Sequence, residues 1–131
     1  MAGNAIVVPN LARNSVALAT SSAPQEIASI RLTKGDWIVF GKAVFLNKYG
    51  QPLNVDLTLV GGIFIDESDG LLPVGTSSGS VGEMMLSVMG PATSEEAGVT
   101  VKMFAKVARA NVIDAFQMSL LAIQVDNILG G

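Results

Sequence analysis

The segment 36–47 is apolar at both of the alternating sets of positions that a strand would present. One set is Trp37, Val39, Gly41, Ala43 and Phe45, and the other is Ile38, Phe40, Val44 and Leu46, interrupted by Lys42. A strand in a small antiparallel domain normally buries one face and exposes the other. Because this strand needs cover on both faces, the pattern predicts that a second copy of the protein covers one of them.

Other segments predict strands separated by turns. The segment 53–59 alternates aliphatic with polar residues, which is typical of a strand with one exposed face. The segment 112–125 is again apolar on both sides, with Phe116, Met118, Leu120 and Ala122 opposite Ala115, Leu121, Ile123 and Val125. Further strands are predicted at 15–20, 26–32, 63–65, 83–89 and 99–108, with an acidic turn at 66–70 and a short edge segment at 71–74.

About eight strands and no convincing helical period predict an all-β fold, an antiparallel jelly-roll β-sandwich. Residues 1–14 are expected to form an extended N-terminal arm, and residues 15–128 the jelly-roll domain. A helix over 94–109 is the one competing interpretation. Gly98 and the β-branched residues after it oppose that helix.

Composition narrows the class of protein. The chain has 131 residues, which suits one domain, and 50% of them are hydrophobic while only 15% are charged. No apolar run approaches the roughly 20 residues of a membrane-spanning helix, and the N-terminus lacks the basic start of a signal peptide. The net charge is −3 and the basic residues are scattered. We therefore expect a protein made in the cytoplasm, with neither a membrane nor nucleic acid as a partner.

The sequence offers little for catalysis, and no enzyme activity or cofactor is expected. It has no histidine and no cysteine, which excludes a Ser-His triad, thiol chemistry and zinc thiolate sites. Asp56, Asp66, Glu67 and Asp69 could supply a carboxylate pair, but they are typical of solvated turns. Asp66 and Asp69 are the candidate Ca²⁺ ligands, although an ordinary acidic turn is favoured because the segment is too short for an EF-hand loop.

Three segments resemble the jelly rolls of the tumour-necrosis-factor and C1q type, and more narrowly the small versions found among bacteriophage virion proteins. They are 34–40, where a glycine precedes an aromatic-led strand, 84–88, and the closing Leu-Leu-Ala-Ile-Gln-Val run at 120–125. The resemblance covers residues 15–128. It implies a homotrimer in which inner sheets meet on a threefold axis, with these interface residues: Trp37, Phe40, Phe116, Met118 and Leu120.

The leading hypothesis is a non-enzymatic virion protein, a trimeric decoration or cement protein on the capsid surface that stabilises a phage head. Its partner would be the major capsid protein. The N-terminal arm would dock by strand addition through Ile6, Val7, Val8 and Pro9.

Two alternatives remain. The first is the receptor-binding head of a phage tail fibre or spike, with saccharide-binding loops at 49–52, 66–70 and 94–96. No coiled-coil heptads precede residue 15 to form its shaft, and the loops are poor in aromatic residues. The second is a cellular C1q-like adaptor, which the absent secretion signal and absent cysteines oppose.

Overall fold

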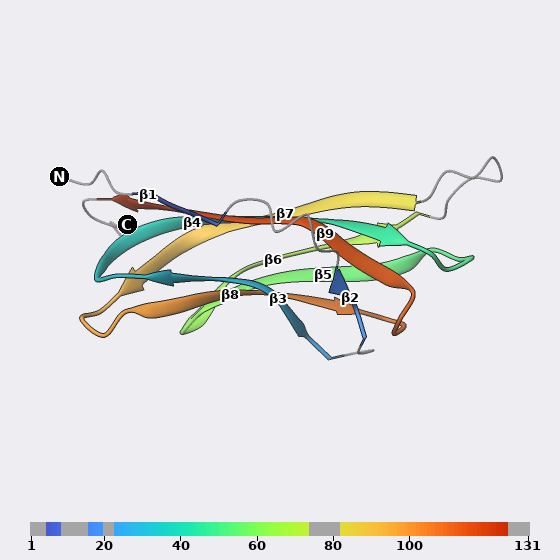
Figure 1. Cartoon of the computed structure of the whole chain (residues 1–131), viewed down its shortest axis with the longest axis horizontal. Helices are drawn as coiled ribbons and strands as arrows, with labels where there is room; N and C mark the ends of the chain where they lie inside the picture. Colours follow the sequence, from blue (N-terminus) through green and yellow to red (C-terminus); the bar gives the residue numbers. More distant parts are fainter. Residues whose placement is uncertain (1–4, 9–15, 20–22, 74–81, 126–131) are drawn as a thin grey trace.

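Alternating buried and exposed positions build two antiparallel sheets that stack face to face (Figure 1). The computed structural model describes residues 5–8, 16–19, 23–73 and 82–125. The five-stranded sheet has the order β1-β9-β4-β7, with β2 also paired to β9, and the four-stranded sheet has the order β3-β8-β5-β6. The strands of the first sheet are β1 (Ala5–Val8), β2 (Val16–Ala17), β4 (Gly35–Asn47), β7 (Gly82–Ser94) and β9 (Ile113–Val125). Those of the second are β3 (Gln25–Leu32), β5 (Leu53–Gly61), β6 (Ile63–Leu72) and β8 (Val99–Val107).

The chain crosses repeatedly between the sheets, so that β3, β5, β6 and β8 lie in one sheet while β4, β7 and β9 lie in the other. This arrangement confirms the predicted all-β, jelly-roll sandwich. The helix considered for 94–109 is wrong, because β8 occupies most of that segment and pairs with both β3 and β5. No described residue belongs to a helix that could cross a membrane.

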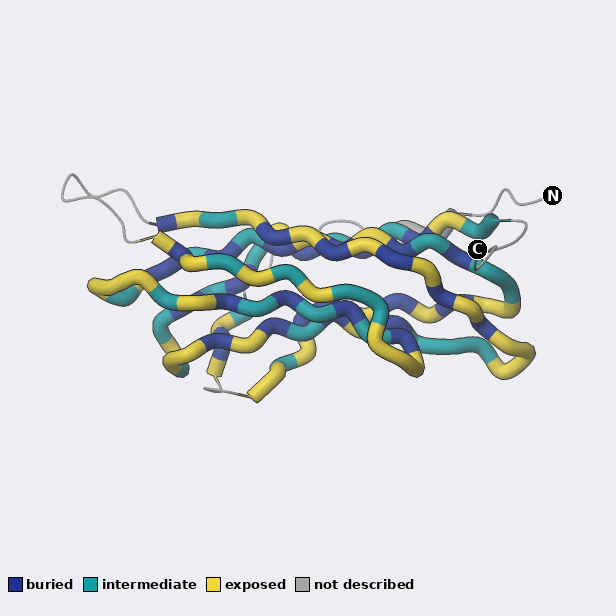
Figure 2. Tube along the Cα trace, turned by 180° about the vertical axis from the view of Figure 1, so that it is seen from behind, coloured by how far each residue is buried: buried dark blue, intermediate teal, exposed yellow. Residues whose placement is uncertain are grey.

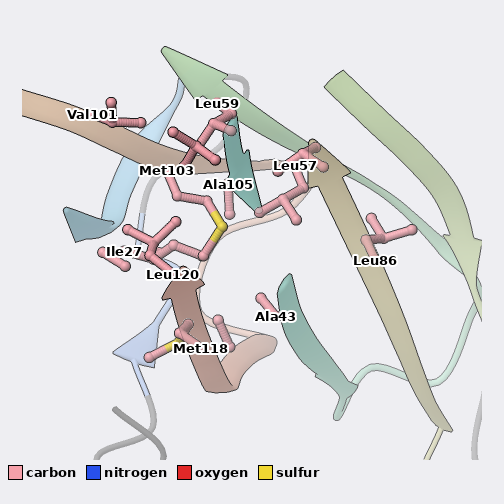
Figure 3. Close-up of a cluster of buried hydrophobic side chains, with 14 of the residues drawn as sticks. Ile27, Ala43, Leu57, Leu59, Leu86, Val101, Met103, Ala105, Met118 and Leu120 are labelled. Carbon is pink, nitrogen blue, oxygen red and sulfur yellow. The ribbon is translucent and has the colours of Figure 1, made fainter. Parts of the chain in front are cut away.

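The core fills the space between the two inner faces. Met103 of β8 reaches across to Leu120 of β9, and both are fully buried (Figure 3). Gly41 of β4 makes room for this contact, because a Cβ there would lie 2.8 Å from the Met103 sulfur and 3.1 Å from a Leu120 methyl. Close packing of this kind leaves no space for an added methyl group without a shift of the neighbours.

The strand β6 differs from the sequence prediction. The acidic turn expected at 66–70 is part of a continuous strand that pairs with β5 from Ile63 to Leu72. A bulge near Ile65, opposite the step from Leu59 to Val60, shifts the register. The acidic residues are tolerated because β6 is an edge strand whose outward side chains reach water.

The edge strands β6 and β7 belong to different sheets but lie against each other and close one side of the sandwich. Two glycines allow this approach. A Cβ on Gly90 would lie 2.5 Å from the Ile65 Cγ2 atom, and one on Gly70 would lie 2.8 Å from the Met84 Cε atom. The Met89 backbone N–H donates a hydrogen bond of 2.9 Å to the Asp66 carboxylate across the same seam.

The substitution Gly90→Ala should separate β6 from β7, because the new methyl group overlaps Ile65. We expect the free energy of unfolding to fall by about 1–3 kcal/mol, the usual cost of overpacking. Urea denaturation followed by tryptophan fluorescence measures it. The matched control is Gly50→Ala, where a Cβ meets no atom within 4 Å, and an equal loss in both variants would contradict this description of the seam.

Candidate interface on the outer face of the five-stranded sheet

The two sheets present very different outer faces to solvent. The outer face of the four-stranded sheet is mostly polar, and its lysines are neutralised within the sheet. Lys102 lies 3.6 Å from Glu26, and Lys106 lies 3.8 Å from Asp56. These paired charges are stable in water, and the large exposed apolar side chains of this sheet are confined to its edge strand β6.

The outer face of the five-stranded sheet, called here the apolar face, is instead dominated by large hydrophobic side chains. Exposure is highest for Met85 at 58%, Met89 at 56%, Ile123 at 39% and Phe40 at 36%. Along the strands, buried positions alternate with exposed or intermediate ones, as the tube in Figure 2 shows. Further apolar side chains of this face are intermediate in exposure, among them Ile38, Val44, Leu46, Phe116 and Leu121.

A bulge in β9 decides which of its residues reach the apolar face. Gln117 has a φ of 50°, and the pairing with β4 shifts register beside it. Phe116 pairs with Val44 on the outer side, whereas Met118 turns inward. The grouping of Phe116 with Met118, expected from strict alternation, is therefore wrong.

Three of the predicted interface residues lie in the core instead, so their assignment to the interface is wrong. Trp37 and Met118 are each 1% exposed, and Leu120 is fully buried. The Trp37 indole also donates a 3.0 Å hydrogen bond to the Thr33 carbonyl, which satisfies its one polar atom inside the chain. Of the predicted set, Phe40 and Phe116 are on the outer surface.

A hollow of about 460 Å³ opens in the middle of the apolar face. Its walls come from β4, β7 and β9: Phe40, Gly41, Lys42, Ser87, Val88, Met89, Ser119 and Leu121. Lys42 is in register with Ser87 on one side and with Ser119 on the other. These three residues form a polar bar across an otherwise apolar region.

A second exposed set of residues lies on β6. Ile63 is 76% exposed, Phe64 is 62% exposed and Leu71 is 59% exposed. Exposed apolar side chains of this size on two separate parts of one chain are unusual for a monomer. Large exposed apolar patches mark interaction surfaces, so both are candidates for contact with another chain.

The predicted metal ligands do not form a site. Asp66 accepts the hydrogen bond from Met89 at the seam, while Asp69 lies on the outward side of β6 opposite Asp56. Among the residues that the structure describes, no group of three or more acidic side chains is placed to hold a metal ion. The sequence predicts a turn at 66–70, which would bring these carboxylates together. The segment is instead a strand, which puts Asp66 and Asp69 on opposite sides.

The loops considered for saccharide binding are not gathered at one tip. The antiparallel pairing of β4 with β7 places the 49–52 loop at one end of the sandwich and the 94–96 loop at the other, while 66–70 lies within β6. The Arg109 guanidinium lies over the Tyr49 ring, 4.4 Å from its centroid, and occupies the one aromatic side chain of the 49–52 loop. The arrangement lacks a shared aromatic platform.

The predicted docking arm is in part a strand of the protein's own sheet. Residues 5–8 form β1, which pairs antiparallel with β9, with Ile6 opposite Ala122, Val7 opposite Leu121 and Val8 opposite Leu120. An arm separate from the domain is therefore wrong for these three residues. Pro9 lies outside the described residues.

The chain is similar in fold to several solved structures, although its sequence matches no known family. No protein-family model matches the sequence, and no curated protein matches it significantly. Among solved structures, the chain is similar to the Eiger TNF of S. frugiperda, at 7% identity and a TM-score of 0.48, over 97% of this chain and 96% of that chain. It is also similar to a chain of the infectious bursal disease virus Gx strain, at 12% identity and a TM-score of 0.51.

The viral similarity covers 94% of this chain but only 34% of the viral chain, so this chain spans about a third of that protein's length. At such identity it shows a shared fold alone. The similarity to the Eiger protein has the lower TM-score of the two.

Adjacent leucines of β9 test the assignment of faces. Leu120→Ala removes a fully buried side chain, so we expect the free energy of unfolding to fall by about 2–5 kcal/mol at every protein concentration. Leu121→Ala alters the apolar face and should leave the dilute single chain much less affected. Chemical denaturation over a hundredfold concentration range compares them, and equal losses at the lowest concentration would refute the assignment.

Proposed function

We propose that this protein is a homotrimeric structural component of a virion, a decoration or cement protein that binds the capsid surface and stabilises a phage head. The exposed apolar face carries the proposal. Covering a large apolar side chain contributes about 1.5–3 kcal/mol, whereas a surface ion pair contributes about 0–1 kcal/mol. Burial of Phe40, Met85 and Met89 between copies therefore favours association over the single chain, in which they are exposed to water.

The existence of two different apolar surfaces supports a ring rather than a twofold dimer. A twofold contact uses the same surface on both partners, whereas a head-to-tail contact joins two different surfaces and forms a ring when the rotation from copy to copy closes. The apolar face and the exposed side of β6 supply such a pair. Three copies in a ring agree with the resemblance of the sequence to trimeric jelly rolls.

The capsid role rests on the fold, the symmetry of a trimer and an available strand edge. Jelly rolls build viral shells, and the fold is shared with a chain of infectious bursal disease virus. A trimer matches the local threefold positions of an icosahedral shell. Within the described residues β1 is paired on one side only, by β9, so its second edge can accept a strand of the major capsid protein.

The proposal includes no catalytic activity and no nucleic-acid or membrane partner. The chain lacks histidine and cysteine, and its net charge of −3 disfavours contact with phosphate backbones. The protein would be made in the host cytoplasm and act at the capsid surface.

Light scattering should give a mass of three times the 13.5 kDa chain mass at micromolar concentration. The variant Phe40→Ser should raise the concentration at which the trimer dissociates at least tenfold, since about 1.4 kcal/mol corresponds to a factor of ten. The matched control is Tyr49→Ser, which removes an aromatic side chain in the 49–52 loop at one end of the sandwich, away from both surfaces. A monomeric wild-type protein, or equal effects of both variants, would contradict the proposed interface.

The cement role is tested on particles. Phage heads that lack this protein should release their DNA at a lower temperature than complete heads, and adding purified protein back should restore the higher temperature. Dye accessibility of the packaged DNA during heating measures the release. Heads with unchanged heat stability in the absence of the protein would refute a cement role and leave the receptor-binding head as the better interpretation.

A further inference from the structure

The polar bar lies in the middle of the apolar face, and a hydrophobic contact does not explain it. Lys42 lies in the central part of β4, with Ser87 and Ser119 in register on either side. Phe40, Met89 and Leu121 line the same hollow. A lysine at this position would be covered by any copy that covers the apolar face.

Lys42 differs from the other lysines because it has no counter-charge within the described part of the chain. Each of the other four lies within 4.0 Å of a carboxylate: Lys34 with Glu96, Lys48 with Asp114, Lys102 with Glu26, and Lys106 with Asp56. Asp36, on the same side of β4, is six residues away, about 20 Å at the usual rise of a strand. Its carboxylate accepts a 3.0 Å hydrogen bond from Thr93.

The outward side of β6 carries acidic side chains that have no cation as a partner. Glu67 and Asp69 are exposed on its outward face, together with Phe64 and Leu71. Neither carboxylate has an ion pair within the described residues, and the residue opposite Asp69 is Asp56, whose partner is Lys106. One surface thus carries an unpaired ammonium among apolar side chains, and the other carries unpaired carboxylates among apolar side chains.

We propose that Lys42 of one copy pairs with the carboxylates of Glu67 and Asp69 on β6 of the next copy. This inference rests on the proposed trimer and names the partner of its apolar face. A charge that is desolvated without a partner is strongly destabilising, whereas a paired one is tolerated. Two apolar faces packed against each other would bring two Lys42 side chains together, so the lysine also disfavours the face-to-face dimer.

Charge reversal tests the pairing. Lys42→Glu should weaken the trimer at least tenfold, and Glu67→Lys with Asp69→Lys should do the same, because each brings like charges together. All three substitutions in one chain should restore dissociation to within about threefold of wild type, since the charges are again opposite. The matched control is Lys34→Glu, which makes the same charge change at an end of the sandwich and should have little effect.

Light scattering over a dilution series measures dissociation, and circular dichroism checks that each variant is folded. If the Lys42→Glu variant does not fold, the Lys42→Met variant is used to test the pairing. It leaves the neighbouring carboxylates unpaired and should weaken the trimer, whereas a tighter trimer would overturn the pairing.

The outcomes separate this inference from the proposed function. A wild-type monomer would refute the trimer itself. A wild-type trimer that is unaffected by Lys42→Glu, or that the combined variant fails to restore, would overturn the pairing with β6 and leave the trimer standing.

Discussion

The requirement to cover β4 on both faces is the constraint on which the rest of the structure depends. Its inner face is covered by the four-stranded sheet, where Gly41 receives the side chain of Met103. Its outer face has no such cover within the described residues and carries Phe40 exposed. The described part of the chain forms two sheets, and both are used to build the core, so no described element covers the outer face.

The closure of the sandwich between β6 and β7 has a separate cause. The edges of β6 and β7 approach because Gly70 and Gly90 leave space for Met84 and Ile65. This closure fixes the position of β6 and with it the exposed residues Phe64, Glu67 and Leu71. A ring needs two surfaces at a fixed angle on one rigid body, and the seam makes β6 part of the same body as the apolar face.

Much of this could be predicted from the sequence, and the failures have physical causes. The two sets of alternating residues in β4 were assigned correctly because the strand has no bulge within it. Both sets are apolar, so the prediction takes residues of both, Trp37 and Phe40, as interface residues. The charge of Lys42 in the set of Phe40 is the one sign of which set faces outward. In β9 a bulge at Gln117, which has a positive φ, puts Phe116 and Met118 on opposite faces, and alternation alone carries no sign of such a bulge.

The acidic strand β6 was missed for a different reason. Carboxylates clustered before a glycine are typical of a turn, but here the glycine serves close packing against Met84, and the outward carboxylates occupy an edge strand. Edge strands commonly carry charge because it prevents uncontrolled pairing with other chains. On a surface that also exposes Phe64 and Leu71, such charges favour a partner that brings a cation, and the apolar face has one in Lys42. Apolar surfaces can associate with many partners in many orientations. A protein that assembles in one way therefore needs polar groups that raise the free energy of the other arrangements.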